Sequence, residues 1–260
     1  EISNYLNLCR WLDDDISVYG LRFINNQLSP ANFTVNELAA KYLQQIRNIQ
    51  PHGPYFLAGW CIGGTIAFEM ACMLEQAGED VAFLSLINTL APQKWKNIAP
   101  FTIKTEIKFI SSLLGKAAAG NSPRTDSDDM DRLWNSALDL TQFDQASRDR
   151  VNQLIPLDAK LAIPDFAVAE YHTLVKYINT IRSMHNARAL YYPGRMLKTK
   201  LHFFEATIND VIKNKDENIK SWQRYCQLPI ERYRLQGDHF SIFQDPEVES
   251  LGKIISGILS

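Results

Sequence analysis

A strand–helix–strand pattern over residues 55–87 constrains the fold of this chain more than any other feature of the sequence. Residues 55–60 and 81–87 are apolar runs, typical of strands that are buried on both faces of a parallel sheet. Residues 62–76 carry apolar side chains at helical spacing, and Gly78 follows them as a helix stop. Because the connections are short, we expect a right-handed parallel crossover, and hence an α/β fold.

The sequence on either side predicts further elements of the same sheet. Residues 18–23 form a β-rich run, and residues 34–48 form an amphipathic helix with Thr34 and Glu37 as a capping box. The later elements are expected to be a helix over about 164–184, a strand at 200–205, a helix near 219–226, a strand at 230–235, and a final helix with Asp245 as N-cap and Pro246 as its first residue.

Residues 93–163 lack any strand pattern, and their helical runs are broken by polar stretches. We interpret this region as a helical lid inserted into a single domain whose core comprises residues 1–92 and 164–260. The predicted architecture is a mostly parallel sheet with helices on both faces and a helical lid insertion.

Composition excludes several classes of function. The chain has 260 residues, and its 27 basic against 29 acidic residues give a net charge of −2, without the basic excess expected for binding nucleic acid or a membrane surface. Four scattered cysteines without CxxC pairs indicate reduced thiols and a cytoplasmic protein. No metal-ligand spacing, P-loop or G-x-G-x-x-G motif occurs, so we expect neither a metal nor a nucleotide cofactor.

The clearest chemical motif is Gly-Trp-Cys-Ile-Gly-Gly at residues 59–64, between the first apolar strand and its helix. It matches the nucleophile elbow G-x-S-x-G of α/β-hydrolases, with Cys61 in the serine position and Gly59 and Gly63 as the small flanking residues. The helix N-terminus favours the thiolate of Cys61, and the backbone N–H of Ile62 would point at a developing oxyanion. The alternative is a buried structural cysteine in a glycine-rich turn.

A nucleophile of this kind needs a base and a residue that orients the base. His239, just before the final helix, has the position of the base, and Asn88, at the end of the second strand, has that of the orienting residue. Their alternatives are an exposed loop histidine and an ordinary turn residue. Glu205, at the end of the strand from residue 200, is a second candidate for the orienting residue.

These motifs, together with residues 50–55 (QPHGPY) and 237–240 (GDHF), resemble the type I thioesterase domains of nonribosomal peptide synthetases, over essentially the whole chain. The resemblance implies that Cys61 accepts a peptide from the phosphopantetheine arm of an upstream carrier domain, with His239 as base and Asn88 in the usual aspartate position. Family members begin with a strand and a glycine-rich loop that supplies a second oxyanion donor. The sequence starts after both, so Ile62 is the one oxyanion donor that we expect from it.

Cysteine and asparagine replace the usual serine and aspartate together. A thiol is acidic enough to form a thiolate–imidazolium pair, so a neutral asparagine suffices to orient the ring. A cysteinyl thioester also keeps the acyl group activated, and cysteine variants of the family are associated with strained rings, as in sulfazecin-type monobactam synthetases. The resemblance therefore implies release by cyclisation, to a β-lactam first and a β-lactone next. The alternatives are hydrolytic release or editing to a linear acid, and a non-catalytic module that docks a carrier.

Overall fold

The structure, a computed structural model, describes residues 3–23, 27–93, 100–114, 129–139, 146, 149–150, 153, 170–208 and 212–260. The chain divides into two compact units. The first comprises residues 1–22, 33–96 and 187–260, and the second comprises residues 23–32 and 97–186. Each unit has its own hydrophobic cluster.

The first unit is built on a parallel sheet that has four strands among the described residues. They are β1 (Tyr55–Trp60), β2 (Val81–Ile87), β3 (Leu201–Ala206) and β4 (Glu231–Leu235), hydrogen-bonded in the order β1-β2-β3-β4. Helix α3 (Ile62–Gln76) connects β1 to β2, as the sequence predicts. The carboxyl ends of these strands therefore lie at one edge, where α/β proteins place their binding and catalytic residues.

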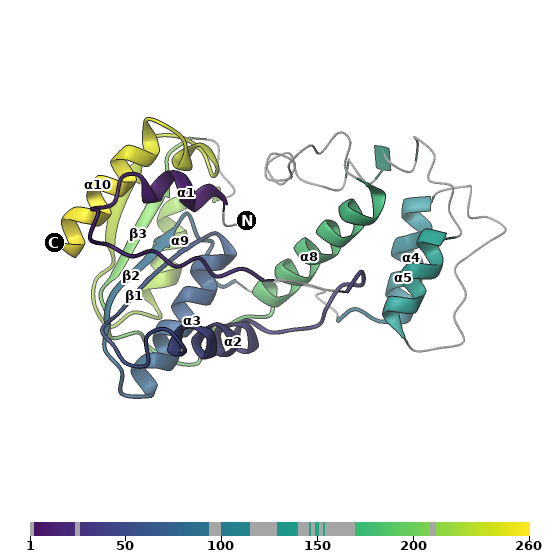
Figure 1. The fold of residues 1–260 in the computed structure, drawn as a ribbon, viewed down its shortest axis with the longest axis horizontal. Helices are drawn as coiled ribbons and strands as arrows, with labels where there is room; N and C mark the ends of the chain where they lie inside the picture. The colour runs from purple at the N-terminus through teal and green to yellow at the C-terminus, as the bar shows by residue number, and fades with distance from the viewer. Residues whose placement is uncertain are drawn as a thin grey trace. The chain divides into compact units, whose positions relative to one another are not determined.

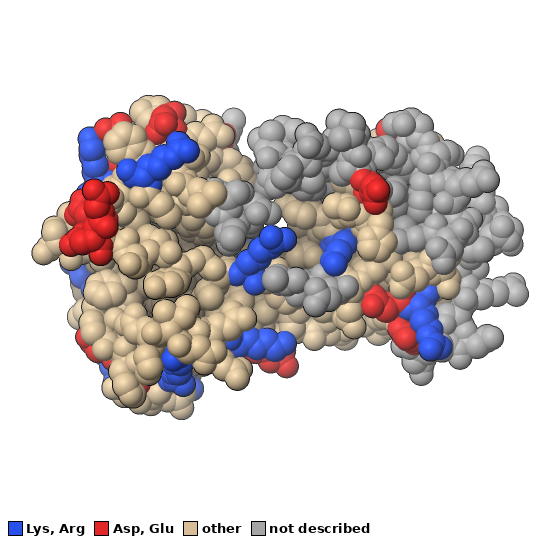
Figure 2. Space-filling model, viewed as in Figure 1, with Lys and Arg blue, Asp and Glu red and all other residues tan. Residues whose placement is uncertain are grey.

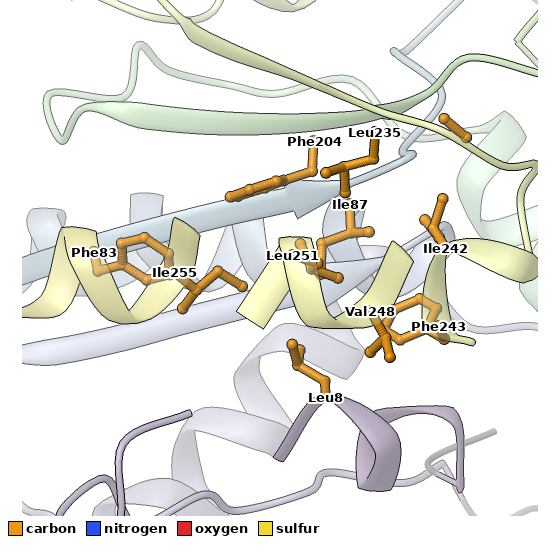
Figure 3. Close-up of a cluster of buried hydrophobic side chains, with 11 residues drawn as sticks. Leu8, Phe83, Ile87, Phe204, Leu235, Ile242, Phe243, Val248, Leu251 and Ile255 are labelled. Atoms are coloured by element: carbon orange, nitrogen blue, oxygen red, sulfur yellow. The ribbon is translucent and has the colours of Figure 1, made fainter. Parts of the chain in front are cut away.

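Helices cover both faces of this sheet (Figure 1). Helices α1 (Ser3–Cys9) and α10 (Glu247–Leu259) pack on one face, where apolar side chains of β2, β3 and β4 meet them (Figure 3). Helix α3 packs against β1 and β2, and the ring of Trp222 in α9 (Lys215–Gln223) lies 4.9 Å from that of Phe68 in α3. The α/β fold with a parallel sheet and flanking helices is thus confirmed.

Helix α2 (Val35–Arg47) packs on α3 and begins where the sequence predicts. Its N-cap Thr34 accepts a hydrogen bond from the Glu37 N–H at 3.1 Å, and the Glu37 carboxylate accepts one from the Thr34 N–H at 2.7 Å. Two N–H groups that lack helical acceptors are satisfied in this way, so the predicted capping box is confirmed.

Three local expectations for the first unit are wrong. Residues 18–23 form no strand, because the side chains of Val18 and Tyr19 are exposed and the segment has no place in the described sheet. Strand β1 alternates between buried and exposed residues, with Phe56 55% exposed, so it is covered on one face only along this stretch. Pro246 is the N-cap of α10, which begins at Glu247 rather than at Pro246.

The second unit is helical among its described residues. Helices α4 (Ile103–Leu114), α5 (Met130–Asp139) and most of α8 (Tyr171–Ala189) surround a cluster that includes Leu133, Trp134 and Leu174. The predicted insertion, 93–163, shares residues 97–163 with this unit. Leu28 packs in this cluster and its N–H donates to Asp131 at 3.0 Å, so residues 23–32 belong to the second unit, as does α8 up to residue 186.

Charged side chains of both signs are interspersed on the face of the described residues that Figure 2 shows. None of the helices in the described ranges has the length and apolar character needed to span a bilayer.

Candidate active site

Cys61 lies in a sharp turn between β1 and α3. Its backbone has φ 54° and ψ −124°, a conformation that is costly for any residue with a side chain. The Cys61 N–H donates to the Ile87 carbonyl at 3.0 Å, and the Cys61 carbonyl accepts from the Gly64 N–H at 3.1 Å. These bonds hold a half-buried thiol at the carboxyl edge of the sheet. The geometry is that of a nucleophile elbow.

Close backbone approach around the elbow requires glycine at two positions. A Cβ on Gly59 would overlap the carbonyl of Gly63, and a Cβ on Gly64 would overlap the side chain of Thr89. A Cβ on Gly63 would meet only the hydroxyl of Tyr5, at an ordinary 3.6 Å. The second required glycine is therefore Gly64 and not, as the elbow pattern suggests, Gly63.

The structure brings Asn88 and His239 together. Asn88 directly follows β2, and its Nδ2 atom lies 2.7 Å from Nδ1 of His239, in the loop after β4. Both side chains are buried, at 1% and 5% exposure, so solvent does not compete for this hydrogen bond. Asn88 has φ 45°, a left-handed conformation that asparagine tolerates better than most residues.

Two neighbours set the orientation of the Asn88 amide. Oδ1 accepts a hydrogen bond from the Ala206 N–H at 3.4 Å, which leaves Nδ2 facing His239. In this orientation Nδ2 donates to Nδ1, so the neutral imidazole carries its proton on Nε2. A protonated imidazole needs an acceptor at Nδ1, which the amide supplies by turning over. Asn88 can thus bind either state of the ring.

Trp60 links the turn at Cys61 to the loop that carries His239. Its indole N–H donates to the His239 carbonyl at 3.0 Å, and its ring lies 4.7 Å from the imidazole, centroid to centroid, at an interplanar angle of 35°. Its backbone N–H donates to the Tyr5 hydroxyl at 2.8 Å. Burial of that hydroxyl raises the pKa of Tyr5 to about 12, so it remains protonated. Neither contact could be predicted from the sequence, because both partners lie far from Trp60 in the chain.

The loop that carries His239 is fixed by its neighbour Asp238. One carboxylate oxygen of Asp238 accepts hydrogen bonds from the N–H groups of Phe240 and Ser241, each at 2.9 Å. These bonds lower the pKa of the Asp238 carboxyl. Asp238 therefore shapes the turn that carries His239.

Glu205, the second candidate for the residue that orients His239, is engaged elsewhere. Its carboxylate, 2% exposed, accepts hydrogen bonds from Arg232 at 2.8 to 3.1 Å and lies 3.4 Å from Nε of Arg234. Side chains alternate along β3, so Phe204 and Ala206 face α10 while Glu205 points to the opposite face. The hydrogen bond to Nδ1 comes from Asn88 instead.

The other cysteines differ from Cys61 in their surroundings. Cys72 and Cys226 are buried, and burial raises the pKa of both thiols, that of Cys226 to about 12. Cys9 is half-buried in α1. Within the described residues no three histidine, cysteine or acidic side chains gather as metal ligands would.

Ile62 is the first residue of α3, so its N–H has no acceptor within the helix and is available to an oxyanion.

Known proteins with similar sequences include nonribosomal peptide synthetases. The chain is 26% identical over 261 residues to the nonribosomal peptide synthetase apvA of Aspergillus terreus, covering 98% of this chain and 26% of that protein. It is 26% identical over 255 residues to a dimodular nonribosomal peptide synthase of Bacillus subtilis, covering 97% of this chain and 10% of that one. The chain thus spans about a quarter or less of these relatives.

Solved structures give the same fold. A four-domain nonribosomal peptide synthetase, holo-AB3403, matches 98% of the chain with a TM-score of 0.64 and 23% identity, and the chain covers 18% of it. The Vlm2 thioesterase domain bound with a dodecadepsipeptide matches 99% with a TM-score of 0.63 and 17% identity, and 89% of it is covered. The model of the family described as "Thioesterase domain" matches residues 2–259. This chain therefore belongs to the thioesterase domain family.

Proposed function

We propose that this thioesterase domain accepts a peptide from the phosphopantetheine thioester of an upstream carrier domain onto Cys61, and releases it by intramolecular cyclisation. The observation that carries this proposal is the placement of three residues at one edge of the sheet. Cys61 occupies the elbow after β1, and Asn88 after β2 holds His239 after β4 at 2.7 Å. A thiol, an imidazole and an orienting amide are the groups that papain-like enzymes use.

In the first step, the Asn88 amide turns over and the neutral imidazole shifts to its Nδ1–H tautomer, whose Nδ1–H donates to Oδ1 of Asn88. The unprotonated Nε2 atom of His239 then takes the proton of the Cys61 thiol. The thiolate attacks the thioester carbonyl, and the Ile62 N–H stabilises the resulting oxyanion. Collapse of the tetrahedral intermediate breaks the bond to the pantetheine sulfur, which receives the proton from His239. The peptide is then held on Cys61 as a new thioester.

In the second step, an amine or hydroxyl of the bound peptide loses its proton to His239 and attacks the Cys61 thioester. Collapse expels the Cys61 sulfur and closes the ring. A thioester remains more activated than the oxoester that a serine would form, so cysteine favours attack that leads to a strained ring. We favour a β-lactam, with a β-lactone next. No cofactor beyond the arm of the carrier takes part.

Two peptidyl pantetheine thioesters test this function, one ending in a 2,3-diaminopropionyl residue and the other in a seryl residue. A β-amine gives a β-lactam and a β-hydroxyl gives a β-lactone. We expect intact-protein mass spectrometry to show an acyl-enzyme with the natural sequence and none with Cys61→Ala. An acylated Cys61→Ala protein would contradict the proposal.

Product analysis separates the remaining alternatives. A cyclic product supports the proposed release, whereas a linear acid alone shows hydrolytic or editing activity. Carrier binding without turnover of either thioester would identify a non-catalytic docking module.

A further inference from the structure

We propose that Trp60 is a positioning residue whose indole ring stabilises the protonated imidazole of His239, and thereby the thiolate of Cys61. This inference rests on the proposed function, in which these two residues act as base and nucleophile. Without the usual carboxylate, the opposite charges of His239 and Cys61 need another group to stabilise them.

The charged pair needs a stabilising group because Asn88 serves the neutral ring better. In the orientation that the structure shows, Oδ1 accepts from the Ala206 N–H and Nδ2 donates to His239. Protonation of the imidazole requires the amide to turn over, which places its NH2 group against the Ala206 N–H, another donor. A neutral amide also supplies no negative charge to a ring that is 5% exposed.

Trp60 lies where such a group is needed. Its ring centroid is 4.7 Å from that of the imidazole, within the roughly 6 Å over which aromatic faces attract cations. The planes are tilted by 35°, so the two rings are closer to parallel than to an edge-to-face arrangement. Indole attracts a cation more strongly than the rings of phenylalanine or tyrosine do.

The indole is also held in place from several sides. Its N–H donates to the carbonyl of the same histidine at 3.0 Å, and its backbone is tied to the Tyr5 hydroxyl. The rings of Phe240 and Phe243 pack on it at 5.1 and 5.4 Å, at angles of 89° and 71°. Because Trp60 directly precedes Cys61, these contacts fix the distance between the histidine loop and the elbow.

The direction of the effect follows from the charge of the pair. Stabilising the imidazolium raises the pKa of His239, so the ring stays positively charged up to a higher pH. This nearby positive charge lowers the pKa of the Cys61 thiol. The thiolate is then populated at lower pH. Removing the indole should lower the pKa of His239 and raise the pKa of the Cys61 thiol.

The test measures alkylation of Cys61 by iodoacetamide against pH, in a Cys9→Ser background that removes the other half-buried thiol. We expect Trp60→Leu to move the inflection of the alkylation rate to higher pH by about one unit, and Trp60→Phe to move it by less. At pH values below the wild-type inflection, Trp60→Leu should turn over the peptidyl pantetheine thioester about tenfold more slowly than the wild-type protein. The rate should recover at high pH. A lost structural contact would lower the rate equally at every pH.

Phe240→Leu is the matched control, because the Phe240 ring contacts the imidazole at 4.8 Å and 75° without stacking on it. A shift as large as that of Trp60→Leu would show that packing alone is responsible and would overturn the inference. Unchanged inflections in both folded Trp60 variants would do the same. A direct measurement is the NMR titration of His239 in Cys61→Ala, where Trp60→Leu should lower its pKa.

The experiment distinguishes the inference from the function on which it rests. If the wild-type protein is not acylated at Cys61, the proposed function fails whatever the alkylation profile shows. If it is acylated normally and the Trp60 variants keep the wild-type profile, only the role of Trp60 fails.

Discussion

The chemistry proposed for this protein depends on a match between two side chains, the thiol of Cys61 and the neutral amide of Asn88. Serine in place of Cys61 would need a base strengthened by a carboxylate, because a hydroxyl is a far weaker acid than a thiol. We therefore expect Cys61→Ser to slow acyl-enzyme formation by about 10²- to 10⁴-fold. Rapid-quench mass spectrometry with a peptidyl pantetheine thioester measures this rate.

The same match predicts how an acid at residue 88 behaves. Aspartate tolerates the left-handed backbone of this position and accepts from Nδ1–H in the protonated state. Asn88→Asp should therefore speed the Cys61→Ser variant by at least tenfold, about 1.4 kcal/mol, and change the cysteine enzyme much less. Independent, additive effects of the two substitutions would show that the residues are not coupled.

Among the local elements, the elbow depends on the close approach of β1 and α3. A methyl group on Gly59 would strike the backbone of Gly63, where no side chain can move aside. We expect Gly59→Ala to destabilise the fold by about 2 kcal/mol or more, as other overpacked sites do. Gly257 in α10 has no atom within 4 Å of an added Cβ, so Gly257→Ala should stabilise the protein by up to about 1 kcal/mol. Urea unfolding of the two variants tests this contrast.

The stability that the turn carrying His239 contributes to the fold should depend on pH. Because the pKa of Asp238 is lowered in the folded protein, its carboxylate contributes stability above the unfolded pKa of about 4, and that contribution is lost as pH falls below this value. Asp238→Ala should cost about 1 kcal/mol at neutral pH, typical of a lost helix cap, and less in acid. Asp238→Asn keeps an acceptor oxygen and should retain most of the stability. A cost for Asp238→Ala that does not change with pH would exclude the carboxylate as its cause.

The elements show which structural features a sequence can predict. The capping box of Thr34 and the crossover of β1, α3 and β2 follow from spacing between near neighbours, so they were predicted correctly. Residues 18–23 have strand-like composition, but pairing depends on a partner strand that composition does not show. Helix α1 was missed, because its short pattern gives little periodic signal.

The candidate site shows the same limit. Chain order predicted Cys61 and Asn88 at strand ends and His239 just before the final helix, and in the structure Asn88 and His239 are in contact. Chain order alone could not separate Asn88 from Glu205, because both were expected at the ends of strands of the same sheet. The choice depends on which face of β3 Glu205 occupies, and Arg232 fixes that face through an ion pair 27 residues away.

At the scale of the whole molecule, the chain forms two cores that need not share their stability. The second unit contains a buried charge, Glu106, which is 0% exposed and joins helices α4, α5 and α8. Its oxygens accept from Arg182 in α8 at 2.7 and 2.8 Å and from the indole of Trp134 in α5 at 3.2 Å. The Arg182 guanidinium also lies 3.7 Å over the ring of Phe109 in α4.

Loss of Arg182 would leave the Glu106 carboxylate buried without its cation, which typically costs about 3–5 kcal/mol. Because its partners all belong to the second unit, we expect Arg182→Met to raise hydrogen exchange in α4, α5 and α8 while β1–β4 keep their protection. Thr173→Ala, an exposed change on the same helix, is the control and should leave both units protected. Equal loss of protection in the strands would show that the two cores unfold as one cooperative unit.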